Sequence, residues 1–253
     1  DLDGTLVRSD VLVESALRLV QTSPGHALSL ARWLRGGKAH LKHAIAERVD
    51  LPVELLPYAG HVLERVREAR SQGRPVVLAT ATDGRYARRI AYHLGVFDRV
   101  FASDGQVNLS AERKAAVLVE AYGEGGFDYL ANARADLAVW QRARHALVVD
   151  PERGVLGRLA AAGIPHTLVR PREDRLRPAL RALRPHQWLK NLLVFLPLLT
   201  SHLYTQPGAV LATLLAFAAF SLTASAGYLV NDLLDLEADR RHPRKRTRPL
   251  AAG

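Results

Sequence analysis

Short apolar runs alternate with helix-like stretches over the first two thirds of the chain. The pattern predicts four strands, at residues 75–80 (PVVLAT), 128–131 (DYLA), 146–149 (ALVV) and 166–169 (HTLV). Strands separated by helices in this way are typical of a parallel sheet that is covered by helices on both faces. We therefore expect an α/β domain over residues 1–170.

The stretch from residue 9 to about residue 73 shows helical periodicity and no strand pattern. Within it, residues 55–70 predict a helix whose apolar side carries Leu56, Val62, Leu63 and Val66. An all-helical insert directly after the first loop of an α/β domain predicts a helical cap.

The last third of the chain has a different composition. Residues 171–184 are rich in Arg and Pro and are expected to form a basic linker. Residues 208–230 then run without a charge, and about 20 apolar residues suffice for a helix to cross a bilayer. Residues 188–204 form a weaker span, so a transmembrane α-helical hairpin is expected at the start of a domain covering 185–253. The alternative for 208–230 is a buried helix of a large soluble domain.

Charge and cysteine content limit the partners and the metals. The chain has 253 residues, no Cys and a net charge of +10. Without thiolates, any metal must be held by oxygen or imidazole ligands, which favours a hard cation such as Mg²⁺. The positive charge suggests nucleic acid, phosphorylated substrates or an anionic membrane face. Because the densest basic run, residues 240–248, adjoins a membrane span, we expect membrane lipid and no nucleic acid as a partner, with both ends of the hairpin and the α/β domain in the cytoplasm.

The chain opens on two carboxylates, Asp1 and Asp3, in the segment DLDGTL. Residues two apart at a strand end point the same way, so both could address one phosphoryl group. Further along follow a Thr that ends an apolar strand (Thr80), a Lys at the start of a helical stretch (Lys114) and an acidic residue after another strand (Asp136). The order of these parts makes the segment a candidate active site.

In this order of parts, residues 1–170 resemble the haloacid dehalogenase-like hydrolases. The resemblance implies a Rossmann-like parallel sheet with a cap, and Asp1 as the nucleophile that accepts the phosphoryl group. It implies Asp3 as the acid and base, Thr80 and Lys114 as phosphate-binding residues, and Mg²⁺ held by Asp1, Asp3 and Asp136. The sequence departs from the family where Gly-Asp is usual, since Ala131 and Asn132 stand there. A degenerate domain that binds phosphate or only folds, or that regulates, is the alternative.

A second set of carboxylates follows the apolar run. Asp232, Asp235 and Asp239 are spaced by three and four residues, so they are expected on one helical face, together with Asn231, as a metal site. The alternative is a solvated helix anchor. Beyond them, Lys245, Arg246 and Arg248 form a cationic cluster that is suited to a diphosphate or to anionic lipid.

This arrangement resembles the first Asp-rich motif of the UbiA prenyltransferases. RPHQWLKN (184–191) and HPRKRTRPLAAG (242–253) make decaprenyl-phosphate phosphoribosyltransferases the closest match. The resemblance implies an integral inner-membrane transferase acting on polyprenyl phosphate with a diphosphate donor, and phosphate contacts from Lys190 and Asn191. The chain is expected to be a fragment holding the opening quarter or so of that domain, and so inactive as a transferase. The alternative is prenyl transfer to an aromatic or tetrapyrrole acceptor.

Overall fold

The computed structural model describes residues 1–170 and 176–253, which fall in two compact units, Asp1–Glu173 and Asp174–Gly253. Of the predicted linker, residues 171–175 lie outside the described residues. In the remainder, Leu176–Ala182 form helix α9, in which Leu, Ala and Arg favour helix and Pro178 stands in the first turn, where proline is tolerated.

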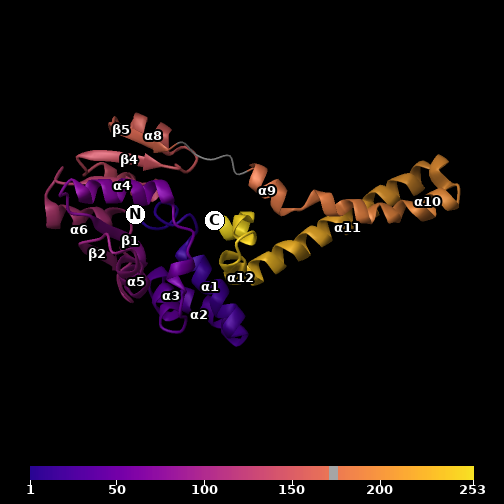
Figure 1. The fold of residues 1–253 in the computed structure, drawn as a ribbon, viewed down its shortest axis with the longest axis horizontal. Helices are drawn as coiled ribbons and strands as arrows, with labels where there is room; N and C mark the ends of the chain where they lie inside the picture. The colour runs from indigo at the N-terminus through magenta and orange to yellow at the C-terminus, as the bar shows by residue number, and fades with distance from the viewer. Residues whose placement is uncertain (171–175) are drawn as a thin grey trace. The chain divides into compact units, whose positions relative to one another are not determined.

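The first unit is built on parallel strands (Figure 1). Strand β1 (Val77–Asp83) pairs in parallel with β2 (Arg99–Ser103). Strand β4 (His145–Val149) pairs in parallel with both β3 (Asp128–Ala131) and β5 (His166–Arg170). The predicted α/β fold with a parallel sheet is therefore confirmed. Strand β2 was not predicted from the sequence.

Helices connect the strands as a parallel sheet requires. They are α5 (Gly84–Leu94), α6 (Ala111–Tyr122), α7 (Leu137–Trp140) and α8 (Val155–Ala161). The Asp83 carboxylate caps α5 by accepting from the main-chain nitrogen of Arg85, and Gly95 ends that helix in the left-handed conformation at φ 63°. The Asp83 cap fixes where β1 ends and α5 begins, next to the candidate site residues of that strand.

The insert between residues 9 and 73 consists mainly of helices, with an irregular stretch before the last of them that includes an isolated bridge from Tyr58 to Val7. Helices α1 (Val11–Thr22), α2 (Ala27–Arg35), α3 (Lys38–Ala46) and α4 (Gly60–Ser71) make it up. Asp10 starts α1 because its carboxylate accepts from the main-chain nitrogens of Leu12 and Val13. Helix α4 begins at Gly60, five residues later than the pattern predicts, since Val53–Leu55 form a separate 3-10 turn.

Two apolar clusters hold the first unit together. One joins Leu2, Leu6 and Val7 to the buried faces of α4 and α5, and the other surrounds Trp140. Leu2 is fully buried, so the side chains of Asp1 and Asp3 on either side of it face away from that core. The main-chain nitrogen of Asp1 donates to the carbonyl of Leu130 in β3 (2.9 Å), which anchors the opening segment beside that strand.

The second unit contains helix α11 (Pro207–Leu234), which has 28 residues and is long and apolar enough to cross a membrane. Only 11% of its most apolar stretch is buried, so its surface faces outward. Among the described residues it is the one helix with these properties. Residues 188–204 form instead 3-10 helix η4 (Pro185–Phe195) and helix α10 (Leu196–Thr200), broken next to Pro197. That this stretch also crosses a membrane stays a prediction.

Helix η4 packs antiparallel along α11 (Figure 1). Trp188 donates to Ser225 (3.0 Å), Asn191 donates to Ser221 (3.1 Å), and Phe195 stacks at a tilt on Phe217 with a centroid distance of 5.5 Å. Successive residues of η4 contact residues that come progressively earlier in α11, so the two helices run antiparallel, as in a helical hairpin. Small residues on α11 allow the close approach.

Beyond α11 lie two short helices, α12 (Leu236–Arg241) and α13 (Pro249–Ala252). Asp235 lies between α11 and α12, and its main-chain nitrogen and carbonyl still form helical hydrogen bonds with Asn231 and Asp239, both of 2.8 Å. Further 3-10 turns are η1 (Pro24–His26), η3 (Arg134–Asp136), η5 (Leu203–Thr205) and η6 (Lys245–Thr247).

Candidate functional site

A buried ammonium group joins two carboxylates in the first unit. The Nζ atom of Lys114, near the start of α6, donates to Oδ1 of Asp1 (2.9 Å) and to Oδ1 of Asp136 (3.1 Å). The hydroxyl of Tyr129 accepts from Lys114 (2.8 Å) and donates to Asp136 (3.0 Å). Lys114 is 3% exposed and Asp136 is 2% exposed, so this charge network is screened little by water. Asp1, Lys114 and Asp136, which are far apart in the sequence, thus meet at one point.

Asp3 lies on the other side of the opening loop. Its Oδ2 atom accepts from the hydroxyl of Thr82 (2.6 Å), and its Oδ1 atom accepts from the main-chain nitrogen of Val11 at the start of α1 (2.8 Å). Burial raises the pKa of the Asp3 carboxyl above its ordinary value, and the nearby charge of Asp10 adds to the shift. A carboxyl group with a raised pKa can retain the proton that a general acid must deliver.

Thr80 is fully buried at the same end of β1. Its Oγ1 atom accepts from the main-chain nitrogen of Thr82 (3.0 Å), while the hydroxyl of Thr82 is committed to Asp3. In the bond with the nitrogen of Thr82, the Thr80 hydroxyl is the acceptor, so the proton of this hydroxyl is available to a phosphate oxygen. Thr82 thus connects Thr80 with Asp3 through two hydrogen bonds.

The oxygen atoms around Asp1 fit a hard cation in part. Asn132 follows β3, and its Oδ1 atom accepts from the Thr5 hydroxyl (3.2 Å). Gly4 adopts φ 69° there, and a Cβ atom on it would lie 2.6 Å from Nδ2 of Asn132, so only glycine allows this approach. Asp1, the Asp3 carbonyl and Asn132 offer the hard oxygen donors that Mg²⁺ takes.

Asp136, for which the resemblance implies a ligand role, is bonded to protein groups in this structure, and the ligand role stays a prediction. Its Oδ1 atom accepts from Lys114 and Tyr129, and its Oδ2 atom accepts from the main-chain nitrogen of Ala133 (3.1 Å). Three of its about four acceptor positions are thus used, one of them by Lys114. Within residues 1–170 and 176–253, no group of three or more acidic or His side chains is placed to hold a metal ion.

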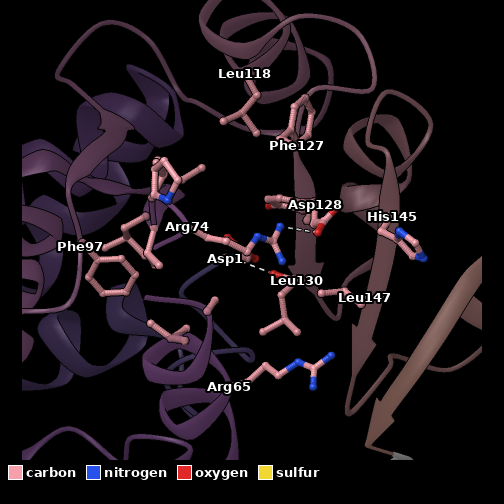
Figure 2. A pocket seen from close by; sticks show the side chains of 18 of the residues that line it. Asp1, Arg65, Arg74, Phe97, Leu118, Phe127, Asp128, Leu130, His145 and Leu147 are labelled. Carbon is pink, nitrogen blue, oxygen red and sulfur yellow. Dashed lines mark hydrogen bonds and ion pairs between the residues drawn. The ribbon is translucent and has the colours of Figure 1, made fainter. Parts of the chain in front are cut away.

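A cavity of about 580 Å³ lies on the other side of Asp1, between the edges of β1 and β3 (Figure 2). Its walls are mostly apolar, with Leu118, Phe97 and Leu130 among them, and an ion pair of Arg74 with Asp128 stands in it. Of the candidate site residues, Asp1 is among the described lining, whereas Thr80, Lys114 and Asp136 are not. The phosphate site predicted from the sequence is therefore distinct from this cavity.

In the second unit, two of the three carboxylates of the Asp-rich segment meet at one guanidinium. The Nη1 atom of Arg248 donates to Oδ1 of Asp232 (3.2 Å) and to Oδ2 of Asp239 (2.6 Å). Arg184 adds two bonds to Asp232, of 2.6 and 2.9 Å. Asp232 and Asp239 are 4% and 1% exposed. The arrangement is a buried cluster of opposite charges.

Asp235 is not part of this cluster. Its Oδ2 atom accepts from Nδ2 of Asn231 (3.0 Å), one turn earlier. That all three carboxylates share one face stays a prediction, since Asp232 and Asp239 share Arg248 whereas Asp235 pairs with Asn231. Arginines bind both oxygens of Asp232 and Oδ2 of Asp239, whereas Oδ1 of Asp239 is buried without a hydrogen bond. The described residues hold no three-ligand group there, and the metal site stays a prediction.

The remaining predicted phosphate contacts of this unit lie at its surface. Lys190, Lys245 and Arg246 are exposed, and the Nζ atom of Lys245 stands 3.8 Å from Oδ1 of Asp239. Asn191 is committed to Ser221 on α11. Arg248 is the predicted cation that is drawn into the carboxylate cluster.

Sequence reasoning missed three residues of these sites. Tyr129 and Thr82 hold Asp136 and Asp3, and nothing in their local sequence separates them from ordinary strand residues. Arg184 pairs with Asp232 and stacks over the ring of Tyr228 (4.9 Å). Its signal was present, since it opens the RPHQWLKN segment that carries the resemblance.

The chain is similar to known proteins over its whole length and, separately, over its last third. Residues 194–253 match the UbiA prenyltransferase family. An uncharacterized protein of Sinorhizobium fredii is 40% identical over the whole chain, which covers 49% of that protein. A decaprenyl-phosphate phosphoribosyltransferase of Mycobacterium tuberculosis is 49% identical over 29% of the chain and 26% of its own length. The chain thus spans about half or less of the length of these relatives.

A solved structure has the fold of the first unit. A protein of unknown function from Bordetella pertussis superposes with a TM-score of 0.53 at 19% identity, over 67% of this chain and 96% of that protein. At this identity the likeness concerns the fold alone. The chain therefore joins an α/β domain, whose fold is that of the Bordetella pertussis protein, to a segment, residues 194–253, that matches the UbiA prenyltransferase family.

Proposed function

We propose that residues 1–170 form a phosphomonoesterase in which Asp1 is the nucleophile. The observation that carries the proposal is the position of Lys114, a buried cation in contact with both Asp1 and Asp136. A cation placed against a carboxylate nucleophile draws a phosphate toward it and reduces the repulsion between the two anions. Asp136 and Tyr129 keep Lys114 oriented, so they act as positioning residues.

In the proposed reaction an oxygen of Asp1 attacks phosphorus, and the bond from phosphorus to the ester oxygen breaks. Asp3 gives its proton to that leaving oxygen. A water molecule then attacks the phosphorus of the aspartyl phosphate, its proton returns to Asp3, and inorganic phosphate leaves with Asp1 restored. Thr80 donates its hydroxyl to a phosphate oxygen in both steps.

Magnesium dependence is part of the proposal. Asp1, the carbonyl of Asp3 and Asn132 would hold the ion, with Asp136 kept for Lys114. When bound, Mg²⁺ supplies charge that offsets the phosphate oxygens. Because Asn132 lacks the charge of a carboxylate, we expect weak binding of the ion. Hydrolysis measured against Mg²⁺ concentration, with EDTA-treated protein as the starting point, tests this expectation.

For the second unit we propose a part of an integral-membrane transferase that acts on polyprenyl phosphate, with phosphoribosyl transfer from a diphosphate donor as the favoured reaction. The likeness to the Mycobacterium enzyme and the long outward-facing helix α11 support it. The basic residues 240–248 beside α11 favour a cytoplasmic position for that end of the helix, in the inner membrane, and for the phosphatase domain.

The two activities together suggest a reaction sequence. The phosphatase domain would remove the 5-phosphate from the phosphoribosylated lipid that the transferase makes. Phosphate release from that lipid, measured with full-length protein, should be lost in Asp1→Asn. Undiminished release in that variant would refute the proposal, and a wild-type protein inactive on every phosphate ester tested would favour a degenerate, regulatory domain.

Prenyl transfer to an aromatic or tetrapyrrole acceptor is the competing reaction for the transferase. Membranes that contain full-length protein can be supplied with labelled phosphoribosyl diphosphate or with labelled prenyl diphosphate. Label transferred from the first donor to a polyprenyl phosphate supports our proposal. Label transferred from the second donor alone supports the alternative.

A further inference from the structure

A second cation from the helical insert reaches the end of β1 where the candidate active site lies. Lys42, on α3, donates from Nζ to the carbonyl of Ala81 (2.5 Å) and to Oδ1 of Asn108 (3.2 Å). The next residue, His43, contacts Oδ2 of Asp83 through Nδ1 (2.9 Å). Helix α3 is thus fixed to the end of β1 that follows Thr80.

The Nζ atom of Lys42 makes no direct contact with a carboxylate. Its two acceptors are neutral, and among residues 1–170 and 176–253 no acidic side chain stands within 4.0 Å of this atom, whereas Lys114 contacts two. The side chain is partly buried, and burial lowers its pKa, while the nearby charges of Asp3 and Asp10 act in the opposite direction. An ammonium group has three donors and two are used here, so one remains to bind an anion.

An anion bound by Lys42 would lie beside the phosphate that Asp1 attacks. Ala81, its acceptor, lies between Thr80 and Thr82, and the hydroxyl of Thr82 binds Asp3. The carboxylates of Asp3 and Asp10 raise the pKa of Lys42 and the ammonium group of Lys114 lowers it, so these groups lie near its Nζ atom. Lys42 therefore stands next to the acid–base residue, on the side of the site that the helical insert covers.

We propose that Lys42 is a specificity-determining residue that binds a second anionic group of the substrate, separate from the phosphate that Asp1 attacks. The inference rests on the proposed phosphomonoesterase activity. With this role, Lys42 favours phosphate monoesters that carry another phosphate or a phosphodiester near the phosphate that is removed. The lipid substrate proposed above is of this class, since its sugar carries a phosphodiester as well as the 5-phosphate.

The test compares two soluble probes, ribose 5-phosphate and ribose 1,5-bisphosphate, on the full chain in detergent. Lys42→Gln should raise KM for the bisphosphate by about tenfold or more, the effect of losing one charge-assisted hydrogen bond, with kcat little changed. KM for ribose 5-phosphate should stay within about twofold, because a monophosphate makes no use of the second contact. Lys42→Arg should restore most of the discrimination.

Lys38, exposed on the same helix, provides the matched control. Lys38→Gln should leave both KM values unchanged. An equal rise in KM for both probes in Lys42→Gln would mean that Lys42 only holds the main chain at Ala81. That result would overturn the inference.

Calorimetric binding of ribose 1,5-bisphosphate separates this inference from the proposed activity. If wild-type protein hydrolyses neither probe but binds the bisphosphate, and Lys42→Gln weakens that binding about tenfold, the activity fails and the inference stands. Binding that is absent, or that is equal in wild type and Lys42→Gln, overturns the inference whatever the turnover.

Discussion

Replacement of Lys114 by methionine should strongly destabilise the first unit. The change removes the ammonium group and keeps a long apolar side chain, so Asp1 and Asp136 lose their cation in a site where Asp136 is 2% exposed. Removal of one partner from a buried ion pair costs about 3–5 kcal/mol, because the remaining charge stays desolvated. We expect a loss in this range for Lys114→Met.

Tryptophan fluorescence during urea unfolding can measure this loss. The chain has three Trp residues, and Trp140 is buried in the cluster that also contains Tyr129. In a background with Trp33→Phe and Trp188→Phe, the fluorescence of Trp140 reports on the first unit. The free energy of unfolding follows from the linear dependence on urea concentration.

The matched control is the exposed pair of Arg142 with Glu124 (3.1 Å), whose side chains are 52% and 57% exposed. Arg142→Gln should cost about 0–1 kcal/mol, since water screens such a pair. The double variant Lys114→Met with Asp136→Asn should recover part of the loss, because it removes one uncompensated charge. A loss below about 1 kcal/mol for Lys114→Met would refute the claim that this network is desolvated.

Three further changes test other parts of the account. Asp10→Asn keeps the cap of α1 but removes a charge that raises the pKa of Asp3, so the basic limb of the pH–rate profile, where Asp3 loses its proton, should move to lower pH. Gly4→Ala should cost at least about 1–2 kcal/mol, by thermal unfolding, and slow phosphate release, because φ is 69° and the new Cβ atom would displace Asn132. Arg248→Ala should lower the melting temperature of the protein in detergent, since two buried carboxylates lose a shared donor, whereas Arg248→Lys should restore part of it.

The parts of the fold that depend on strong local patterns could be predicted from the sequence. Apolar runs bounded by turns gave the positions of β1, β3, β4 and β5, since buried strands need such runs. Strand β2 was missed because it is short, begins at an exposed Arg99 and has an intermediate or exposed side chain at four of its five positions. Its assignment depends on pairing with β1, which no local pattern shows.

Many residues of the candidate sites could be predicted from the sequence, but the contacts among them could not. The carboxylates, Thr80 and Lys114 were recognised from their order along the chain, whereas Tyr129, Thr82 and Lys42 reach the site through tertiary packing alone. At the Asp-rich segment, the spacing agrees with the meeting of Asp232 and Asp239 at one guanidinium. It could not show that Arg184 pairs with Asp232, because that contact joins residues 48 positions apart.

Detection of the covalent intermediate tests the central claim most directly. Full-length protein is mixed with a ³²P-labelled phosphate ester, quenched in acid and digested, and the labelled peptide is sequenced by mass spectrometry. We predict label on Asp1 that hydroxylamine releases, and no label in Asp1→Asn. Label on any other residue, or phosphate release that continues unchanged in Asp1→Asn, would contradict the account.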